Sequence, residues 1–351
     1  MSVHILDAMA REGFESFVAL HDRKSGLRAF LGVHDTTRGP AFGGVRRWEY
    51  RDERGALLDC LRLARAMTHK CALLDLPAGG AKVVVLDREG VDWEGAYRAI
   101  GRAVEGMGGR FYTGPDVGTG ERELGWMSGQ TAYVTDPGPA GPGELAASTA
   151  EGVFRGIESA LTHLDGEPDW NQRSIAVQGL GAVGWNLAER LLGVGAKVYG
   201  TDVLPDRVDL AQERLGVEPL RPGEEVSMVC DVLAPCAMGG MLHDLSVERL
   251  KCRIVAGGAN NVLAKPLHGD RMHERDILYV PDFVLNSGAL IRGTIFHLEG
   301  RREPVGVVGE RVGAAVRSVL DRARDAGEPP ARTAAALAEE RIGAWRAEAG
   351  T

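Results

Sequence analysis

Two lysines, Lys70 and Lys82, stand in a short apolar stretch that carries Gly79 and Gly80 shortly before the second lysine. Apolar surroundings disfavour the charged form of an amine, and a second amine nearby acts in the same direction. One lysine of such a pair can be a free base near neutral pH while the other stays charged and binds a carboxylate, which indicates an enzyme. The structural alternatives are a solvated lysine after a glycine turn for Lys82 and a helix C-terminal cation for Lys70.

A second chemical signal is a glycine pattern that follows an apolar run and opens a predicted helix. In that context the glycines let a pyrophosphate approach the backbone at the helix N-terminus. Asp202 ends the next predicted strand, where it can accept hydrogen bonds from ribose hydroxyls and repels a ribose phosphate, so NAD is favoured over NADP. A purely structural glycine turn is the alternative. The predicted cofactor-binding turn consists of Gly179, Gly181, Ala182, Val183 and Gly184.

The elements that must position the lysines are predicted from apolar periodicity. Short apolar runs at 17–20 and 27–34, joined by a polar connector with glycine, predict a hairpin. Apolar residues at helical spacing from Gly55 onward place Lys70 at the end of a helix, and residues 83–86 are predicted to be a buried strand. A later strand leads into the loop that carries Asp116, whose structural alternative is a turn cap.

A run rich in proline and glycine at 136–143 cannot hold regular structure, so we place a domain boundary there. Beyond it strands alternate with helices, which predicts a parallel, doubly wound sheet. Asn260 and Asn261 follow a predicted strand at its carboxyl end, where such sheets bind ligands, although both can be simple turn formers. The predicted fold is α/β, with a mixed-sheet domain at 1–142, a Rossmann domain at 143–330 and a C-terminal helix in 331–351 that packs back on the first domain.

The composition excludes several classes of function. The 351 residues, 44% hydrophobic and 26% charged, fit two globular domains, and the net charge of −8 offers no general attraction to nucleic acid or to an anionic membrane. No apolar run approaches the roughly 18 to 20 residues of a membrane span, so we expect a cytoplasmic protein. Five cysteines form no CxxC pair and nine histidines are scattered, so we expect reduced thiols and no metal site.

Blocks of residues through almost the whole chain resemble the NAD-dependent amino-acid dehydrogenases that act on leucine, valine and phenylalanine, relatives of glutamate dehydrogenase. The resemblance implies oxidative deamination of an L-amino acid to a 2-oxo acid and ammonia, reversible as reductive amination. It also implies a homo-oligomer whose first domain binds the substrate and mediates oligomerisation. The matching blocks are residues 34–37, 39–44, 67–70, 79–82, 113–118, 234–239, 258–261 and 281–288.

The resemblance implies roles for individual side chains. Lys70 binds the substrate carboxylate, Lys82 is the general base that activates water for attack on the imine, and Asp116 exchanges a proton with the amino nitrogen. The remaining implied roles are Asn260 for the substrate amine, Gly43 and Met67 for further substrate contacts, Thr149 and Asn286 for orienting the nicotinamide, and Cys236 and Ala237 for further cofactor contacts.

The substrate side-chain pocket is expected at Phe42, Gly114, Leu290 and Gly293. Gly114 with Leu290 resembles the members that prefer phenylalanine, whereas members with aliphatic substrates tend to carry alanine and valine there. The missing side chains at Gly114 and Gly293 enlarge the predicted cavity, which suits an aromatic ring. Phe42 stands where leucine is usual and can refill the cavity or stack on that ring.

Some residues depart from the family pattern. Ala81 replaces a glycine beside Lys82, where its methyl can alter how the lysine is presented, and Arg292 stands where a small or amide side chain is common. His69 and the approach to Thr149 at 143–149 also differ. The leading hypothesis is an NAD-dependent dehydrogenase of a large hydrophobic, aromatic L-amino acid. The alternatives are a leucine or valine dehydrogenase and a catalytically silent NAD-binding sensor of metabolites, which the departures at 81 and 292 would favour.

Overall fold

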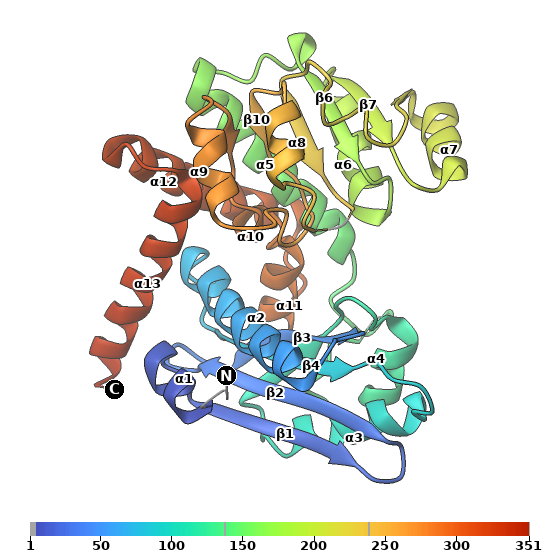
Figure 1. The fold of residues 1–351 in the computed structure, drawn as a ribbon, viewed down its shortest axis with the longest axis vertical. Helices are drawn as coiled ribbons and strands as arrows, with labels where there is room; N and C mark the ends of the chain where they lie inside the picture. Colours follow the sequence, from blue (N-terminus) through green and yellow to red (C-terminus); the bar gives the residue numbers. More distant parts are fainter. Residues whose placement is uncertain (1–4, 137, 238, 351) are drawn as a thin grey trace. The chain divides into compact units, whose positions relative to one another are not determined.

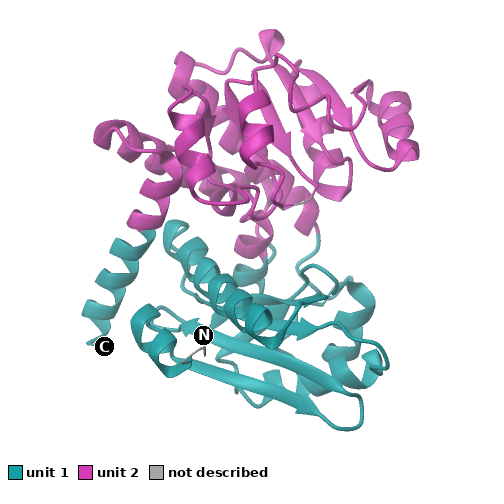
Figure 2. Cartoon of the chain, in the orientation of Figure 1, with its two compact units in different colours: residues 1–143, 293–302, 338–351 teal, residues 144–292, 303–337 magenta. Residues whose placement is uncertain are grey.

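The computed structural model describes residues 5–136, 138–237 and 239–350. The chain forms two compact units, coloured separately in Figure 2. Unit 1 comprises residues 1–143, 293–302 and 338–351, and unit 2 comprises residues 144–292 and 303–337. Residues 293–302 were expected in the second domain, at 143–330, whereas they belong to unit 1.

Unit 1 is built on a mixed five-stranded sheet with the order β1-β2-β4-β3-β5 (Figure 1). The predicted hairpin is present, because β1 pairs antiparallel with β2 and β2 pairs antiparallel with β4. β3 then runs parallel to both β4 and β5. The elements are α1 (Ile5–Glu12), β1 (Ser16–Asp22), β2 (Leu27–Asp35), β3 (Ala41–Trp48), α2 (Glu53–Leu73), β4 (Gly79–Leu86), α3 (Trp93–Glu105), β5 (Phe111–Gly114) and α4 (Glu121–Ser128).

The two faces of this sheet are covered by different helices because side chains alternate along a strand. Strand β4 is buried along its whole length. Its residues Ala81, Val83 and Val85 belong to one apolar core with α3 and α4. On the other face Val84 and Leu86 pack with residues of α2. The methyl group of Ala81 therefore lies in the core on the face opposite Lys82, and its expected effect on how the lysine is presented stays a prediction.

Helix α2 lies close to the sheet at a glycine. A Cβ built on Gly80 would lie 2.2 Å from the backbone nitrogen of Thr68, so only glycine allows the helix to approach this far. The hydroxyl of Thr68 also hydrogen-bonds to Nδ1 of His34 on β2, at 2.8 Å. Burial lowers the pKa of His34 to about 4, so this histidine is a neutral packing residue near pH 7. These contacts fix the register of α2 on the sheet.

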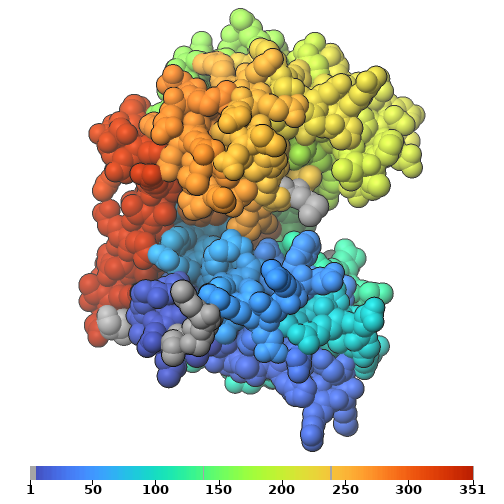
Figure 3. All heavy atoms as spheres, viewed as in Figure 1, coloured from blue at the N-terminus to red at the C-terminus, as the bar shows by residue number. Residues whose placement is uncertain are grey.

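The C-terminal helix α13 (Pro330–Ala349) enters unit 1 at residue 338 and holds the end of α2. The guanidinium of Arg341 donates to the carbonyls of Ala72 and Leu73, both at 3.0 Å, at the C-terminal end of the helix, where a cation is favourable. Arg346 forms an ion pair with Asp35 at 2.8 Å. In Figure 3 the C-terminal atoms, in red, lie beside the dark blue atoms of the N-terminal helix.

Unit 2 is built on a six-stranded sheet with the order β11-β10-β9-β6-β7-β8, in which every pair of neighbours is parallel. The predicted doubly wound α/β architecture is confirmed. The elements from residue 144 onward are α5 (Leu145–Asp165), a 3₁₀ turn (Trp170–Gln172), β6 (Ser174–Gln178), α6 (Ala182–Gly193), β7 (Lys197–Thr201), α7 (Pro205–Leu215), β8 (Glu218–Pro219), β9 (Val232–Pro235), α8 (Asp244–Arg249), β10 (Ile254–Val255), α9 (Leu267–His273), β11 (Leu278–Tyr279), α10 (Asp282–Leu285), α11 (Gly288–Glu299) and α12 (Val305–Ala326).

Across the described residues, no helix has the length and apolar character that a membrane crossing requires. All five cysteines are free thiols. No group of three or more histidine, cysteine, aspartate or glutamate side chains is placed to hold a metal ion within the part of the chain that the structure describes.

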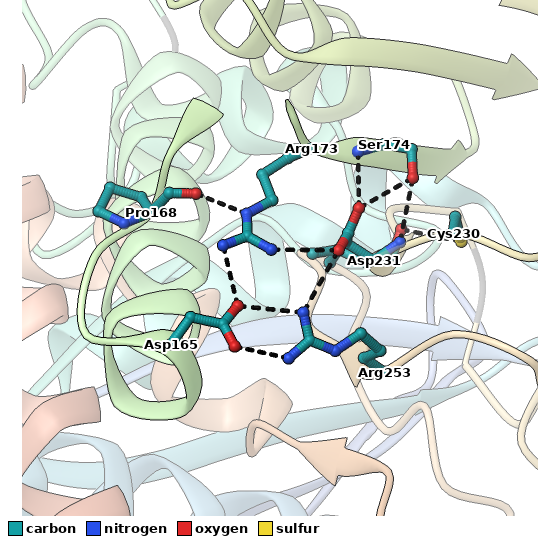
Figure 4. Close-up of polar contacts among 8 residues, drawn as sticks. Asp165, Pro168, Arg173, Ser174, Cys230, Asp231 and Arg253 are labelled. Carbon is teal, nitrogen blue, oxygen red and sulfur yellow. Dashed lines mark hydrogen bonds and ion pairs between the residues drawn. The ribbon is translucent and has the colours of Figure 1, made fainter. Parts of the chain in front are cut away.

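Four charged side chains tie together the amino ends of the unit 2 strands (Figure 4). Arg173 bridges Asp165 and Asp231 at 2.9 and 3.3 Å, and Arg253 bridges the same two carboxylates at 2.7 and 3.5 Å. Asp231 also accepts from the backbone nitrogen and hydroxyl of Ser174, both at 3.0 Å. The cluster joins the end of α5 to the starts of β6, β9 and β10.

The two arginines of this cluster differ in burial, with side chains 12% exposed for Arg173 and 45% exposed for Arg253. We expect Arg173→Ala to lower the free energy of unfolding by about 2 kcal/mol, because it leaves two partly buried carboxylates short of a partner. Arg253→Ala is the matched control and should cost less than about 1 kcal/mol. Urea unfolding followed by circular dichroism measures both, and equal losses would contradict this account.

Candidate active site

Lys82 lies in the middle of β4 on the face that α2 covers, and its side chain is only 7% exposed. It is therefore not the solvated surface lysine of the structural alternative. Its ammonium nitrogen is 2.6 Å from Oδ2 of Asp116. The antiparallel partner of Lys82 on β2 is Gly32, which has no side chain to occupy the space beside the lysine. The structure thus joins two of the predicted site residues in one buried ion pair.

Asp116 reaches Lys82 because its loop lies directly on the sheet. A Cβ built on Gly44 of β3 would lie 2.4 Å from the carbonyl oxygen of Pro115, so a larger residue at 44 would displace the loop. Burial opposes ionisation of Asp116, but the charges of Lys82 and Arg46 outweigh it and hold the pKa of this carboxyl well below its ordinary value. Asp116 is therefore an anion across the neutral range.

Arg46, which was not among the predicted site residues, completes this group. Its Nε donates to Oδ2 of Asp116 at 3.1 Å, and its Nη1 lies 3.3 Å from Oδ2 of Asp59 on α2. The hydroxyl of Tyr50 donates to the same Asp59 oxygen at 2.6 Å. Arg46 shares a strand face with Phe42, which was a predicted site residue. A period-of-two reading of residues 42–46 was the signal that could have found it.

Lys70 and Met67 lie in the last part of α2, three residues apart and thus on one side of the helix. Both are half-buried. Gly43, another predicted substrate contact, is placed differently. A Cβ built on Gly43 would lie 1.7 Å from the carbonyl oxygen of Ala81, so this glycine serves the close approach of β3 to β4.

The ring of Phe42 is buried and stacks on Tyr112 of β5, with ring centroids 5.0 Å apart and planes 7° apart. His297 lies 4.9 Å from the Tyr112 ring and hydrogen-bonds through Nε2 to the hydroxyl of Thr135 at 3.3 Å. Burial lowers the pKa of His297, which favours the neutral imidazole. Phe42 thus packs into an aromatic cluster of unit 1.

The expected pocket positions differ in the space around them. A Cβ built on Gly114 would lie 3.1 Å from the hydroxyl oxygen of Thr135, so part of the space left by this glycine is filled. A Cβ built on Gly293 would meet no atom within 4 Å. Leu290 lies one helical turn before Gly293 on α11 and is half-buried. The open space is therefore at Gly293.

In unit 2 the three glycines of the predicted cofactor-binding turn, at 179, 181 and 184, have different structural roles. Gly179 has a φ of +92°, and a Cβ there would lie 2.6 Å from Cβ of Ala237. Gly184 allows α6 to pack on the turn, because its Cβ would lie 1.8 Å from the carbonyl oxygen of Gly179 and 3.4 Å from Cβ of Cys236. Gly181 caps α6, and a Cβ there would meet only the mobile end of Arg207 at 3.8 Å. Ala182 and Val183 form the first helical turn.

Asp202 directly follows β7 and braces this turn. Its two carboxylate oxygens accept from the backbone nitrogens of Leu180 at 2.8 Å and Leu204 at 3.0 Å. Burial disfavours the anion, but these two donors and then Arg207 outweigh it and lower the pKa of Asp202. An ionised carboxylate at this position can still accept from ribose hydroxyls through its remaining lone pairs.

The predicted nicotinamide and amine contacts gather around the junction of α5 with α11. The hydroxyl of Thr149 accepts from the backbone nitrogen of Ala289 at 3.3 Å. The side-chain amide of Asn286 donates to Oδ1 of Asn260 at 2.8 Å. A Cβ built on Gly288 would lie 2.0 Å from the carbonyl oxygen of Ser148, so this glycine brings the two segments together.

The residues of unit 2 fit a dinucleotide. The backbone is open above Gly181 at the N-terminus of α6, where the amides and the helix dipole favour an anion.

Arg292 has a structural role in unit 2. Its side chain is 4% exposed and bonds to the carboxylate of Glu144, at 2.8 Å, and to the carbonyl of Glu303. This departure from the family pattern is thus used to hold the start of α5.

Comparison with known proteins identifies the relatives of this chain. Residues 15–133 match the family described as Glu/Leu/Phe/Val dehydrogenase, dimerisation domain, and residues 207–297 match Glutamate/Leucine/Phenylalanine/Valine dehydrogenase. A leucine dehydrogenase of Thermoactinomyces intermedius is 38% identical over 341 residues, which cover 96% of this chain and 93% of that protein. A phenylalanine dehydrogenase of Caldalkalibacillus thermarum is 37% identical over 286 residues, covering 79% and 77%.

Among solved structures, the L-tryptophan dehydrogenase from Nostoc punctiforme is similar with a TM-score of 0.85 and 32% identity, covering 97% of this chain and 99% of that one. The leucine and phenylalanine relatives are almost equally identical, so identity selects no substrate and does not bring the chain closer to the phenylalanine enzymes. Enzymes of this family generally depend on a pyridine nucleotide. The chain belongs to the glutamate/leucine/phenylalanine/valine dehydrogenase family and is an amino-acid dehydrogenase.

Proposed function

We propose that this enzyme catalyses the NAD-dependent oxidative deamination of a large hydrophobic L-amino acid, with preference for an aromatic side chain. The amino acid, NAD⁺ and water give the 2-oxo acid, ammonium, NADH and a proton, and the reverse reaction is a reductive amination. The observation that carries the proposal is the buried pair of Lys82 and Asp116 at 2.6 Å. A buried amine beside a carboxylate is the arrangement that proton transfer to and from water and an amine requires.

In this proposal Lys70 binds the substrate carboxylate and so fixes the α-carbon. Asp116 takes a proton from the substrate ammonium, which frees the nitrogen lone pair to stabilise the iminium ion. NAD held by the residues of unit 2 would supply the acceptor for the hydride of the α-carbon. Lys82 in its neutral form then takes a proton from water as the water oxygen bonds to the iminium carbon. Asp116 then returns its proton to the nitrogen. The C–N bond breaks to release ammonia, and the hydroxyl gives its proton back to the Asp116 carboxylate, which leaves the 2-oxo acid.

Unit 2 supplies the cofactor residues of the proposal. The glycines at 179, 181 and 184 and the first turn of α6 would hold the pyrophosphate, and Asp202 would accept from the adenosine ribose. The carboxylate of Asp202 supports NAD over NADP because it repels a ribose phosphate. Thr149 and Asn286 orient the nicotinamide, Asn260 holds the substrate amine, and Cys236 and Ala237 line the same turn. We also propose a homo-oligomer, which the dimerisation-domain match at residues 15–133 supports.

The preference for an aromatic substrate rests on Gly293, where the structure leaves open space. The similarity to a tryptophan dehydrogenase adds support. A leucine or valine substrate is the alternative within the family, and the match to leucine dehydrogenase favours it. No specific observation favours a silent sensor, because Ala81 packs in the opposite core and Arg292 braces α5.

Lys82→Ala should lower kcat/KM for the amino acid by about 10² to 10⁴-fold, which is the usual contribution of a general base. NAD binding should be unchanged, because the fingerprint belongs to unit 2. Initial rates of NADH formation and an NAD titration by fluorescence measure the two quantities. Lys24→Ala, on an exposed turn of the same unit, is the control and should retain full activity. Turnover by Lys82→Ala at the rate of the control would refute the assigned role.

Gly293→Val tests the pocket. The new side chain has room to form, so the fold should persist, but the side chain occupies the open space. We expect the ratio of kcat/KM for phenylalanine to that for leucine to fall by about tenfold or more, which is the scale at which a few methyl groups discriminate. Gly343→Val on α13 also meets open space and controls for the cost of a β-branched residue in a helix. An unchanged ratio in Gly293→Val would remove position 293 from the pocket.

A further inference from the structure

We propose that Arg46 is a positioning residue that keeps Asp116 paired when Lys82 gives up its proton, and so allows Lys82 to act as a base. The inference deepens the proposed function and rests on it. Arg46 does not touch the reacting atoms in this account. It acts through the carboxylate that Lys82 and Arg46 share.

The geometry places one carboxylate oxygen between two cations. Nζ of Lys82 lies 2.6 Å from Oδ2 of Asp116, and Nε of Arg46 lies 3.1 Å from the same oxygen. The three side chains are 7, 10 and 13% exposed for Lys82, Asp116 and Arg46. Water therefore screens these charges little, and each charge is sensitive to the others.

The charges of Asp116 and Arg46 determine how unfavourable it is for Lys82 to lose its proton. In the free enzyme, before Asp116 takes a proton from the substrate, a neutral Lys82 facing Asp116 alone would leave a buried carboxylate without a charged partner, which is unfavourable. Because arginine stays protonated throughout the accessible pH range, Arg46 still pairs with Asp116 after Lys82 becomes neutral. Arg46 also repels the ammonium form of Lys82. Both effects make the base form of the lysine more accessible.

Asp59 on α2 restrains Arg46 from the other side. Its Oδ2 is 3.3 Å from Nη1 of Arg46 and accepts from the hydroxyl of Tyr50 at 2.6 Å. Its Oδ1 accepts from Arg62 at 2.6 Å. Asp59 thus holds the guanidinium of Arg46 in place beside Asp116. The negative charge of Asp59 also partly offsets the positive charge of Arg46.

The groups packed around the pair come from several elements. On α2 the thiol of Cys60 donates to the carbonyl oxygen of Lys82 at 3.5 Å, and burial raises the pKa of Cys60 to about 12. Burial and then Asp59 raise the pKa of Tyr50 well above its ordinary value. Both groups therefore stay neutral in the assay range. The charged and titratable groups around Lys82 are Arg46 on β3, Tyr50 after it, Asp59, Cys60 and Arg62 on α2, and Asp116 after β5.

The test is the pH dependence of kcat/KM for oxidative deamination, measured with one amino-acid substrate. Activity requires neutral Lys82, so it rises with pH. In Arg46→Gln the ammonium form is favoured, and we expect the rising limb to move to higher pH by about one unit or more, which is the scale of a neighbouring charge. At pH values below the rising limb, kcat/KM of Arg46→Gln should be about tenfold lower than that of the wild type. At high pH the two values should approach each other. Arg46→Lys keeps the positive charge, so its rising limb should lie between those of Arg46→Gln and the wild type.

Two further variants separate charge from structural damage. Asp59→Asn removes a negative charge and should move the limb to lower pH, opposite to Arg46→Gln. Arg47→Gln is the matched control, because Arg47 is the next residue of β3, points to the other face and pairs with Asp87 at 3.4 Å. Its limb should stay in place. The substrate ammonium titrates alike in every variant, so differences between the profiles belong to the protein.

A uniform loss of activity at all pH values in Arg46→Gln, or shifts of the same sign in Arg46→Gln and Asp59→Asn, would overturn the inference. Circular dichroism and NAD binding show whether each variant folds, and Asp59→Asn decides the matter if Arg46→Gln does not fold. Failure of the proposed function has a different signature. In that case the wild-type enzyme itself shows no NADH formation with phenylalanine, tryptophan, leucine or valine.

Discussion

The burial of a lysine on the central strand of a sheet is the constraint on which the rest of unit 1 depends. An ammonium group taken out of water is costly unless an anion is in contact with it. Asp116 supplies that anion at 2.6 Å, and Arg46 shares it. The structure therefore has to bring β4, β3 and the loop after β5 to one point.

Glycine makes this convergence sterically feasible. Gly80 lets α2 approach β4, and Gly44 lets the Asp116 loop lie on the sheet. At both places a Cβ would stand within 2.5 Å of a backbone atom. Unit 2 uses the same device, since Gly184 packs α6 against the turn at Gly179. The chemistry of each unit thus depends on close backbone contacts that a larger residue would prevent.

Much of the fold and a part of the site could be predicted from the sequence. Local periodicity and turn residues predicted the hairpin of β1 and β2, and the strand and helix around the glycine fingerprint, because these depend on neighbours in the chain. The sequence predicted a strand only at 83–86, so it did not place Ala81 and Lys82 on opposite faces of the longer strand β4. The stacking of Phe42 on Tyr112 likewise depends on the pairing of β3 with β5.

The sequence by itself determined the family, the α/β class and the residue types available for chemistry, because motifs of glycine, lysine and aspartate keep their meaning along a linear chain. Only the tertiary structure decided which of those residues are in contact with one another. Arg46 and Asp116 are 70 residues apart in the sequence and meet through sheet order, and the packing of α2 brings Asp59 to the same guanidinium. A period-of-two pattern can place Arg46 on the strand face of Phe42, but the pairing of its charge with Asp116 is a long-range contact that only the folded chain shows.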